Sequence, residues 1–244
     1  MQDREETGDI LKIPDFRTIY SPLDYTLRPM PGPTKRKRQK QEAKTSRVKK
    51  SKTSLDEQLK QTFQSYEEDG IIDDDNLLRF VTDLEIEPDD VVLLVLCEHM
   101  GCETGGEITW SEFERGMKAL HCVNIGDVKE RLVGLRATLA LPEVFDSTYK
   151  FAFKLNLQPS KKILDKDTAI ALWQLMLDGK FLLLDKWVEF LESRDDVLWI
   201  SKDVFIQIQT FSRLSTADIS SWEDDGAWPC VIDDFVEYMQ KAAP

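Results

Sequence analysis

The sequence predicts an all-α domain over residues 55–244, and three observations support this prediction. Apolar residues recur at helical spacing through most of the range. The connecting segments are short, and runs of β-branched residues are few. Finally, the segment that follows Pro88 is apolar on nearly every side over residues 91–97, which predicts a helix at the centre of the core.

The helices are expected in the following order. Leu55, Leu59, Phe63 and Tyr66 mark the first, and the apolar positions within 77–84 mark the second. The central apolar helix comes third. Further helices are predicted near residues 109–121, 125–140, 143–157, 165–178, 181–193, 201–213 and 229–241.

A short pattern repeats inside this range: an aliphatic residue, then Asp, Thr or Ser, then a helix. It occurs at Ile72-Asp73, Ile108-Thr109, Leu164-Asp165 and Ile200-Ser201, and the aliphatic positions are 36 residues apart in each pair. Each second residue can cap the helix that follows. The pattern resembles paired EF-hands, in which one aliphatic residue of each loop joins a short β-bridge.

The loops are poor calcium sites. Calcium takes about six to eight oxygen ligands, normally including an aspartate at the start of the loop and a bidentate glutamate at its end. The first loop would offer Ser65, Glu67, Asp69 and Asn76 around Gly70, and the second Gly101, Glu103, Gly105 and Glu112 around Gly106. Ser65 and Gly101 are weak starting residues, so we expect no bound metal, and a calcium sensor stays an alternative.

Charge divides the chain into two segments. The 244 residues contain 32 Lys/Arg and 45 Asp/Glu; residues 1–54 hold 14 and 7 of these, so residues 55–244 hold the other 18 and 38, a balance of −20. Five prolines in the first 33 residues, without helical or strand periodicity, predict a disordered tail over residues 1–54. Two basic clusters follow, which resemble a bipartite nuclear localisation signal formed by Lys35, Arg36, Lys37, Arg38, Lys49 and Lys50. We expect the nucleus as the location, with the cytoplasm as a second one.

Several functional classes are disfavoured. There is no apolar run of 18 residues and no signal-peptide core, and the four cysteines form no Cys-x-x-Cys pair, which fits a reduced intracellular protein. No aromatic residues separate the basic clusters, which argues against nucleic-acid recognition. No nucleotide-binding or nucleophile motif occurs, and His99 and His121 lack a zinc-type ligand set. We expect no catalytic residues and no cofactor.

The C-terminal stretch carries the most specific signal. Trp222-Glu-Asp-Asp-Gly-Ala-Trp-Pro-Cys-Val-Ile-Asp-Asp-Phe-Val-Glu237 combines an acidic turn with a predicted helix whose apolar face carries Ile232, Phe235 and Val236. This stretch, with the segments 169–181, 184–191 and 201–203, resembles the potentiating-neddylation (PONY) domain of the defective-in-cullin-neddylation family. The resemblance covers residues 55–244 and implies a PONY domain built from degenerate EF-hand-like pairs.

The resemblance also implies a function and partners. Such proteins act as scaffold-type ligases without a covalent intermediate: they hold a cullin's C-terminal domain and the neddylation conjugating enzyme together, beside a RING co-ligase. Positioning alone lowers the entropic cost of the transfer. A nuclear adaptor without ligase activity is a further alternative. No nucleic-acid or membrane partner is implied.

The family's two binding surfaces transfer to residues of this chain. An acidic patch for basic cullin residues maps onto Asp203, Ala227 and Asp233, although each also has a plain structural reading as a helix-start acid or a small turn residue. An apolar groove for the acetylated N-terminus of the conjugating enzyme maps onto Leu77, Leu93, Leu96, Cys97, Met100, Leu155, Leu172 and Leu175, and such residues also suit a plain core.

Overall fold

The computed structural model describes residues 54–103, 105–158, 160–214, 219 and 228–242, and within these ranges most of the chain is helical. A helix occupies residues 54–64. The remaining helices are α2 (Asp74–Asp83), α3 (Val92–Met100), α4 (Trp110–Ala119), α5 (Ile125–Thr138), α6 (Pro142–Leu155), α7 (Lys166–Leu177), α8 (Leu184–Glu192), α9 (Lys202–Leu214) and α10 (Cys230–Ala242). The all-α prediction is therefore confirmed. None of the described helices combines the length and apolar character that crossing a bilayer requires.

The central position of α3 is also confirmed. Seven of its nine residues are buried, including Val92 and Met100 at its ends. It contacts α4, α5 and α6. The close approach to α4 depends on Gly116, because a Cβ at this position would lie 2.2 Å from Cγ and 2.8 Å from Cα of Met100. A glycine at this point lets the two helix backbones approach each other.

The repeated aliphatic positions form two short antiparallel ladders, as the sequence pattern predicts. β1 (Ile71–Ile72) pairs with β2 (Ile108–Thr109), with Ile72 opposite Ile108. β3 (Ile163–Asp165) pairs with β4 (Trp199–Ser201), with Leu164 opposite Ile200. All four aliphatic side chains are buried. Each ladder therefore ties two helix–loop–helix units together.

The residue after each aliphatic position caps the next helix, which confirms the second part of the pattern. Asp73, Thr109 and Asp165 accept a hydrogen bond from the backbone N–H three residues later, at the starts of α2, α4 and α7. Ser201 Oγ accepts from Val204 N at 3.2 Å, at the start of α9. These bonds satisfy backbone donors that a helix start leaves unpaired.

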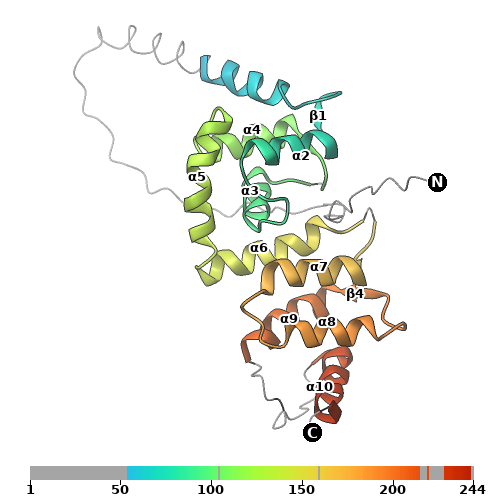
Figure 1. The fold of residues 1–244 in the computed structure, drawn as a ribbon. Helices are drawn as coiled ribbons and strands as arrows, with labels where there is room; N and C mark the ends of the chain where they lie inside the picture. Colours follow the sequence, from blue (N-terminus) through green and yellow to red (C-terminus); the bar gives the residue numbers. More distant parts are fainter. Residues whose placement is uncertain (1–53, 104, 159, 215–218, 220–227, 243–244) are drawn as a thin grey trace, which may run out of the picture.

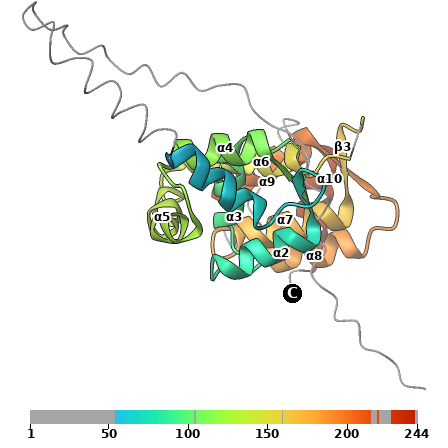
Figure 2. The ribbon, with the colours of Figure 1, turned by 90° about the horizontal axis from the view of Figure 1, so that it is seen from above.

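The helices form two groups joined by α6. In Figure 1 the first helix and α2–α5 lie at one end of the domain, α7–α10 lie at the other, and α6 runs between them. Figure 2 shows the same molecule turned, with α5 on the side opposite β3. Two hydroxyl groups on α6, those of Ser147 and Thr148, each donate to the carboxylate of Glu98 on α3 at 2.5 Å. This polar contact joins the two groups inside an otherwise apolar interface.

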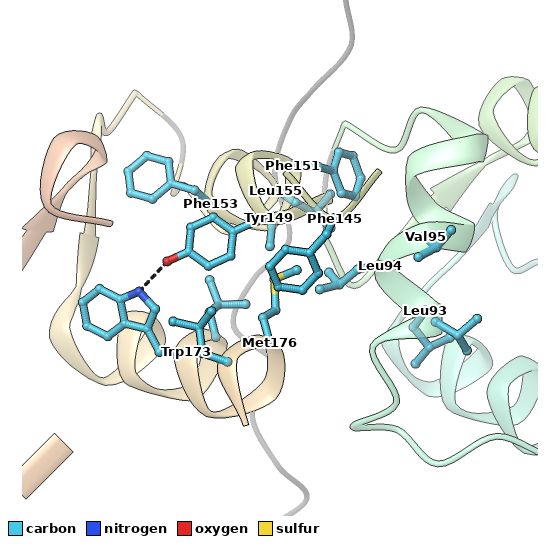
Figure 3. Packing of buried hydrophobic residues seen from close by; sticks show 14 of the residues in the cluster. Leu93, Leu94, Val95, Phe145, Tyr149, Phe151, Phe153, Leu155, Trp173 and Met176 are labelled. Carbon is cyan, nitrogen blue, oxygen red and sulfur yellow. Dashed lines mark hydrogen bonds between the residues drawn. The ribbon is translucent and has the colours of Figure 1, made fainter. Parts of the chain in front are cut away.

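The core of the second group is aromatic. The Trp173 indole N–H donates to Tyr149 Oη at 2.8 Å, and Tyr149 donates in turn to the carbonyl of Phe205 at 2.7 Å. Figure 3 shows the bond between Trp173 and Tyr149, with Leu94 from α3 pointing toward Phe145 and Met176. Because Tyr149 and Trp173 are both fully buried, this chain of bonds satisfies polar atoms that would otherwise be costly to bury.

Candidate functional site

The C-terminal helix α10 is held in place by buried aromatic rings. Phe235 is fully buried and its ring centroid lies 5.2 Å from that of Trp187 and 5.5 Å from that of Phe190, both on α8. Phe211 on α9 lies 6.1 Å from Phe235. Contact with both helices fixes the rotation of α10, which leaves Asp234 and Glu237 exposed and Asp233 half-buried, with its Oδ1 atom withdrawn from solvent. The apolar face predicted for this segment is confirmed.

The structure places two of the three predicted cullin-binding residues. Asp203 is exposed in the first turn of α9, and Asp233 is half-buried in the first turn of α10. The two helices are in contact. Ala227 lies outside the described residues, and so does most of the acidic turn before α10. Both aspartates occupy helix starts, where a carboxylate is stabilised by the helix dipole.

Arg194 organises the carboxylates beside α10. Its guanidinium bonds Asp196 at 2.7 Å and reaches Asp234 on α10 at 2.9 Å. The hydrogen bonds to Arg194 lower the pKa of Asp196 to about 2, and the pKa of Arg194 is raised correspondingly. Asp234 is thus compensated by a cation of its own chain. Asp203 has no ion pair within 4.0 Å among the described residues.

The predicted groove residues come from four helices: α2, α3, α6 and α7. Contacts join α3 to α6 and α6 to α7. Leu77, Cys97 and Leu175 are half-buried at the edge of the core, and Leu93 is 8% exposed. The other four, which are Leu96, Met100, Leu155 and Leu172, are buried among core side chains. The first four therefore keep more solvent-exposed surface than the other four.

The loop residues that align with calcium positions mostly bond within the protein. Glu112 accepts from Glu103 N at 2.6 Å through one oxygen, and from the backbone and hydroxyl of Thr109 through the other. In the first loop Glu67 accepts from Gly70 N, and the side-chain amide of Asn76 donates to Asp73. Within the described ranges no group of three or more His, Cys, Asp or Glu residues is arranged to hold a metal ion.

Two features of the structure were missed from the sequence. The contact of Glu98 with Ser147 and Thr148 joins residues about 50 positions apart, and no local pattern announces it. The other is Trp199, which is 48% exposed on β4 with the ammonium of Lys161 over its ring. Its signal was the stretch 150–164, which contains four lysines and no acid within a strongly acidic domain.

Comparison with known proteins identifies the class of protein to which the chain belongs. Residues 127–238 match the family model described as cullin binding, so the chain is an all-α protein with a cullin-binding domain. It is 32% identical to DCN1-like protein 4 of Drosophila melanogaster over 181 residues, 73% of each chain. It is 30% identical to DCN1-like protein 5 of Rattus norvegicus (70% of this chain, 72% of the relative), and 31% identical to DCN1-like protein 3 of Xenopus tropicalis (86% and 69%).

These matches establish the family to which the chain belongs. The chain belongs to the DCN1-like, or defective-in-cullin-neddylation, family. Its role is in cullin neddylation, with a cullin as a partner. The family resemblance stated from the C-terminal stretch is thereby confirmed.

Proposed function

We propose that the protein is a scaffold-type co-ligase, which holds a cullin's C-terminal domain close to the neddylation conjugating enzyme while a RING protein acts as co-ligase. The observation that carries the proposal is the family match over residues 127–238, which includes α9 and α10 with their two aspartates. Holding two reactants in register lowers the entropic cost of their reaction, so a scaffold needs no catalytic side chain.

The acidic patch is the proposed cullin contact. Asp203 is exposed and forms no ion pair within 4.0 Å in the part of the chain that the structure describes, so a basic residue of the cullin can pair with it directly. Asp233 and Ala227 complete the proposed contact. The balance of −20 over residues 55–244 favours attraction of a basic partner over longer distances, and predicts binding that weakens with salt.

Reconstituted cullin neddylation tests this surface. Asp203→Arg and Asp233→Arg should each abolish most of the stimulation that the wild-type protein gives. Asp185→Arg is the matched control, since Asp185 is also exposed in the first turn of a helix, α8, and its change carries the same dipole penalty. If Asp185→Arg and Asp203→Arg reduce stimulation equally, the patch assignment is wrong.

The second proposed surface receives the acetylated N-terminus of the conjugating enzyme. Leu77, Leu93, Cys97 and Leu175 would meet the incoming helix, and Leu96, Met100, Leu155 and Leu172 would form the floor beneath them. Acetylation matters because it removes a charge that is costly to bury. Titration calorimetry with acetylated and free peptides should show tighter binding of the acetylated form, and Leu175→Glu should remove that preference. Leu182→Glu, at a position 72% exposed, is the control and should keep it.

Two alternatives remain testable. A calcium sensor would bind calcium tightly and open a groove, whereas the bonds of Glu112 within its own loop favour a loop that is closed without metal. Calorimetry with calcium decides between them. A nuclear adaptor without ligase activity would bind a cullin but leave the neddylation rate unchanged in the reconstituted reaction.

We also propose that residues 35–52 direct the protein to the nucleus. Ten of these residues are basic and one is acidic, and they lie outside the described residues. A fluorescent reporter fused to residues 1–54 should accumulate in the nucleus. The same fusion with Lys35, Arg36, Lys37 and Arg38 changed to alanine should not, and equal distribution of both reporters would contradict the proposal.

A further inference from the structure

One segment of the domain is basic although the domain as a whole is acidic. Residues 150–164 contain four lysines and no acid, although residues 55–244 as a whole carry a balance of −20. Lys161 and Lys162 are exposed just before β3, and Lys202 is exposed just after β4. We call Lys154, Lys161, Lys162 and Lys202, together with Trp199, the basic ladder surface.

Pairing of the two strands brings these residues together. Trp199 faces Asp165 across the ladder, and Lys161 Nζ lies 5.6 Å from the centroid of the Trp199 ring. On the neighbouring helix α6, burial lowers the pKa of Lys154, and the nearby charge of Lys202 lowers it further. Figure 2 shows β3 and the orange segment leading to β4 at one edge of the molecule, on the side opposite α5. Lys161 therefore lies against the exposed tryptophan, while Lys202, three residues after Trp199, lies near Lys154 of α6.

The charges of this surface are not compensated by ion pairs. Among the described residues, no carboxylate lies within 4.0 Å of the ammonium groups of Lys154, Lys161, Lys162 or Lys202. The carboxylate opposite Trp199, that of Asp165, caps α7 by accepting from the backbone and hydroxyl of Thr168. The lysine side chains thus keep their ammonium groups available to a partner.

Trp199 adds an apolar element to the site. Its ring is 48% exposed, while the neighbouring Ile200 is 1% exposed and belongs to the core. An aromatic ring held at a rigid ladder, with cations at its edge, can stack on an apolar or aromatic side chain while the lysines bind flanking carboxylates. Exposed tryptophans of this kind are common centres of binding energy at protein interfaces.

We propose that the basic ladder surface docks a short acidic peptide segment that carries an aromatic or large apolar residue. Shortness follows from the charge of the domain. The positive charge extends over a few side chains only, and a salt screening length of about 8 Å limits its reach. A long polyanion or an anionic membrane would also face the surrounding negative surface, and the resulting repulsion disfavours nucleic acid and lipid.

The proposal is independent of the assignment of Asp203 to cullin binding, although Lys202 precedes that residue directly. A partner that binds the basic ladder surface would lie beside a cullin held at Asp203. Since Asp203→Arg adds positive charge next to Lys202, it should leave peptide binding intact or strengthen it, while it removes cullin stimulation. Opposite responses of the two assays to one substitution separate the two proposals.

The test uses the full chain and a fluorescein-labelled peptide of about twelve residues, made of glutamates around one central phenylalanine. Fluorescence anisotropy should show saturable binding that weakens from low to physiological salt. Lys161→Glu should reduce the affinity by about tenfold or more, because it replaces an attraction by a repulsion. Lys60→Glu, an exposed lysine on the first helix, makes the same charge change at the other end of the domain and should have little effect.

The position of binding is checked by NMR. The indole resonance of Trp199, assigned by its absence in Trp199→Phe, should shift on addition of the peptide, whereas those of the buried Trp173 and Trp187 should not. Absence of binding to the wild type, equal loss in Lys60→Glu, or an unchanged Trp199 resonance would overturn the proposal. So would tighter binding of a single-stranded oligonucleotide or an anionic vesicle that is lost in Lys161→Glu.

Discussion

Replacing Gly116 by alanine should destabilise the domain by forcing α3 and α4 apart. The new Cβ would lie 2.2 Å from Cγ and 2.8 Å from Cα of Met100, against the roughly 3.5–4 Å at which carbon atoms pack best. The Met100 side chain can rotate away, but its backbone cannot. Overpacking of this kind costs about 1–3 kcal/mol. The better helix propensity of alanine returns about 0.5–1 kcal/mol, which leaves a net loss of up to about 2.5 kcal/mol.

Gly134→Ala is the matched control. Gly134 also lies inside a helix, α5, but it is exposed and a Cβ there would meet no atom within 4 Å. Only the gain in helix propensity applies, so this variant should be more stable than the wild type by about 0.5–1 kcal/mol. The same chemical change should thus have opposite signs in the two helices.

Urea unfolding followed by circular dichroism measures both effects as changes in the transition midpoint at constant m-value. For a domain of this size about 1 kcal/mol corresponds to ~2–4 °C in the melting temperature, so thermal unfolding should separate the two variants by several degrees. If Gly116→Ala is as stable as Gly134→Ala, the close approach of α3 and α4 does not depend on the missing side chain. The packing argument would then be refuted.

Three further predictions concern single side chains. Glu112→Ala should lower the unfolding free energy by about 1–3 kcal/mol, because it leaves the part-buried backbone N–H groups of Glu103 and Thr109 unpaired, whereas Glu114→Ala, which removes only an exposed ion pair with Lys118, should change it by less than about 0.5 kcal/mol. Tyr149→Phe should cost about 1–3 kcal/mol in the same urea assay, since the hydroxyl serves one buried donor and one buried acceptor. Asp196 should titrate near pH 2 by carboxyl NMR, and Arg194→Ala should return the pKa of Asp196 toward 3.8. The contribution of the Asp196 carboxylate to stability is present above the unfolded pKa and is lost as the pH falls through 2.

Much of the fold could be predicted because local sequence decides it. The alternation of aliphatic residue and capping residue at positions 72, 108, 164 and 200 determines both where four helices begin and which loops pair. The apolar segment around Leu94 could be placed at the centre because no polar face was left for solvent. Helix ends follow the local sequence less closely: α8 begins at Leu184, three residues later than expected, because Phe181 and Leu183 pack into the core from the preceding turn.

The remaining features depend on contacts between distant parts of the chain. Burial of Glu98 needs two hydroxyls from α6, and periodicity shows an acid on a helix without showing its partner. Among the proposed groove residues, helical spacing could not distinguish the half-buried Leu175 from the buried Leu172, because both lie on apolar positions of α7. The acidic patch presents the same difficulty, since exposure of Asp203 follows only from the packing of α9.

The loops provide a physical reason why this domain suits the proposed positioning role. In a calcium-binding loop the last glutamate binds the ion through both carboxylate oxygens, and the loop becomes ordered when the ion binds. Here the carboxylate of Glu112 already accepts from Glu103 and Thr109, so the turn before α4 is held by hydrogen bonds within the protein. A ladder between paired loops then connects helices whose relative positions need no metal. A scaffold that lowers the entropic cost of a reaction must itself be ordered beforehand, because any disorder in it would have to be removed when the partners bind.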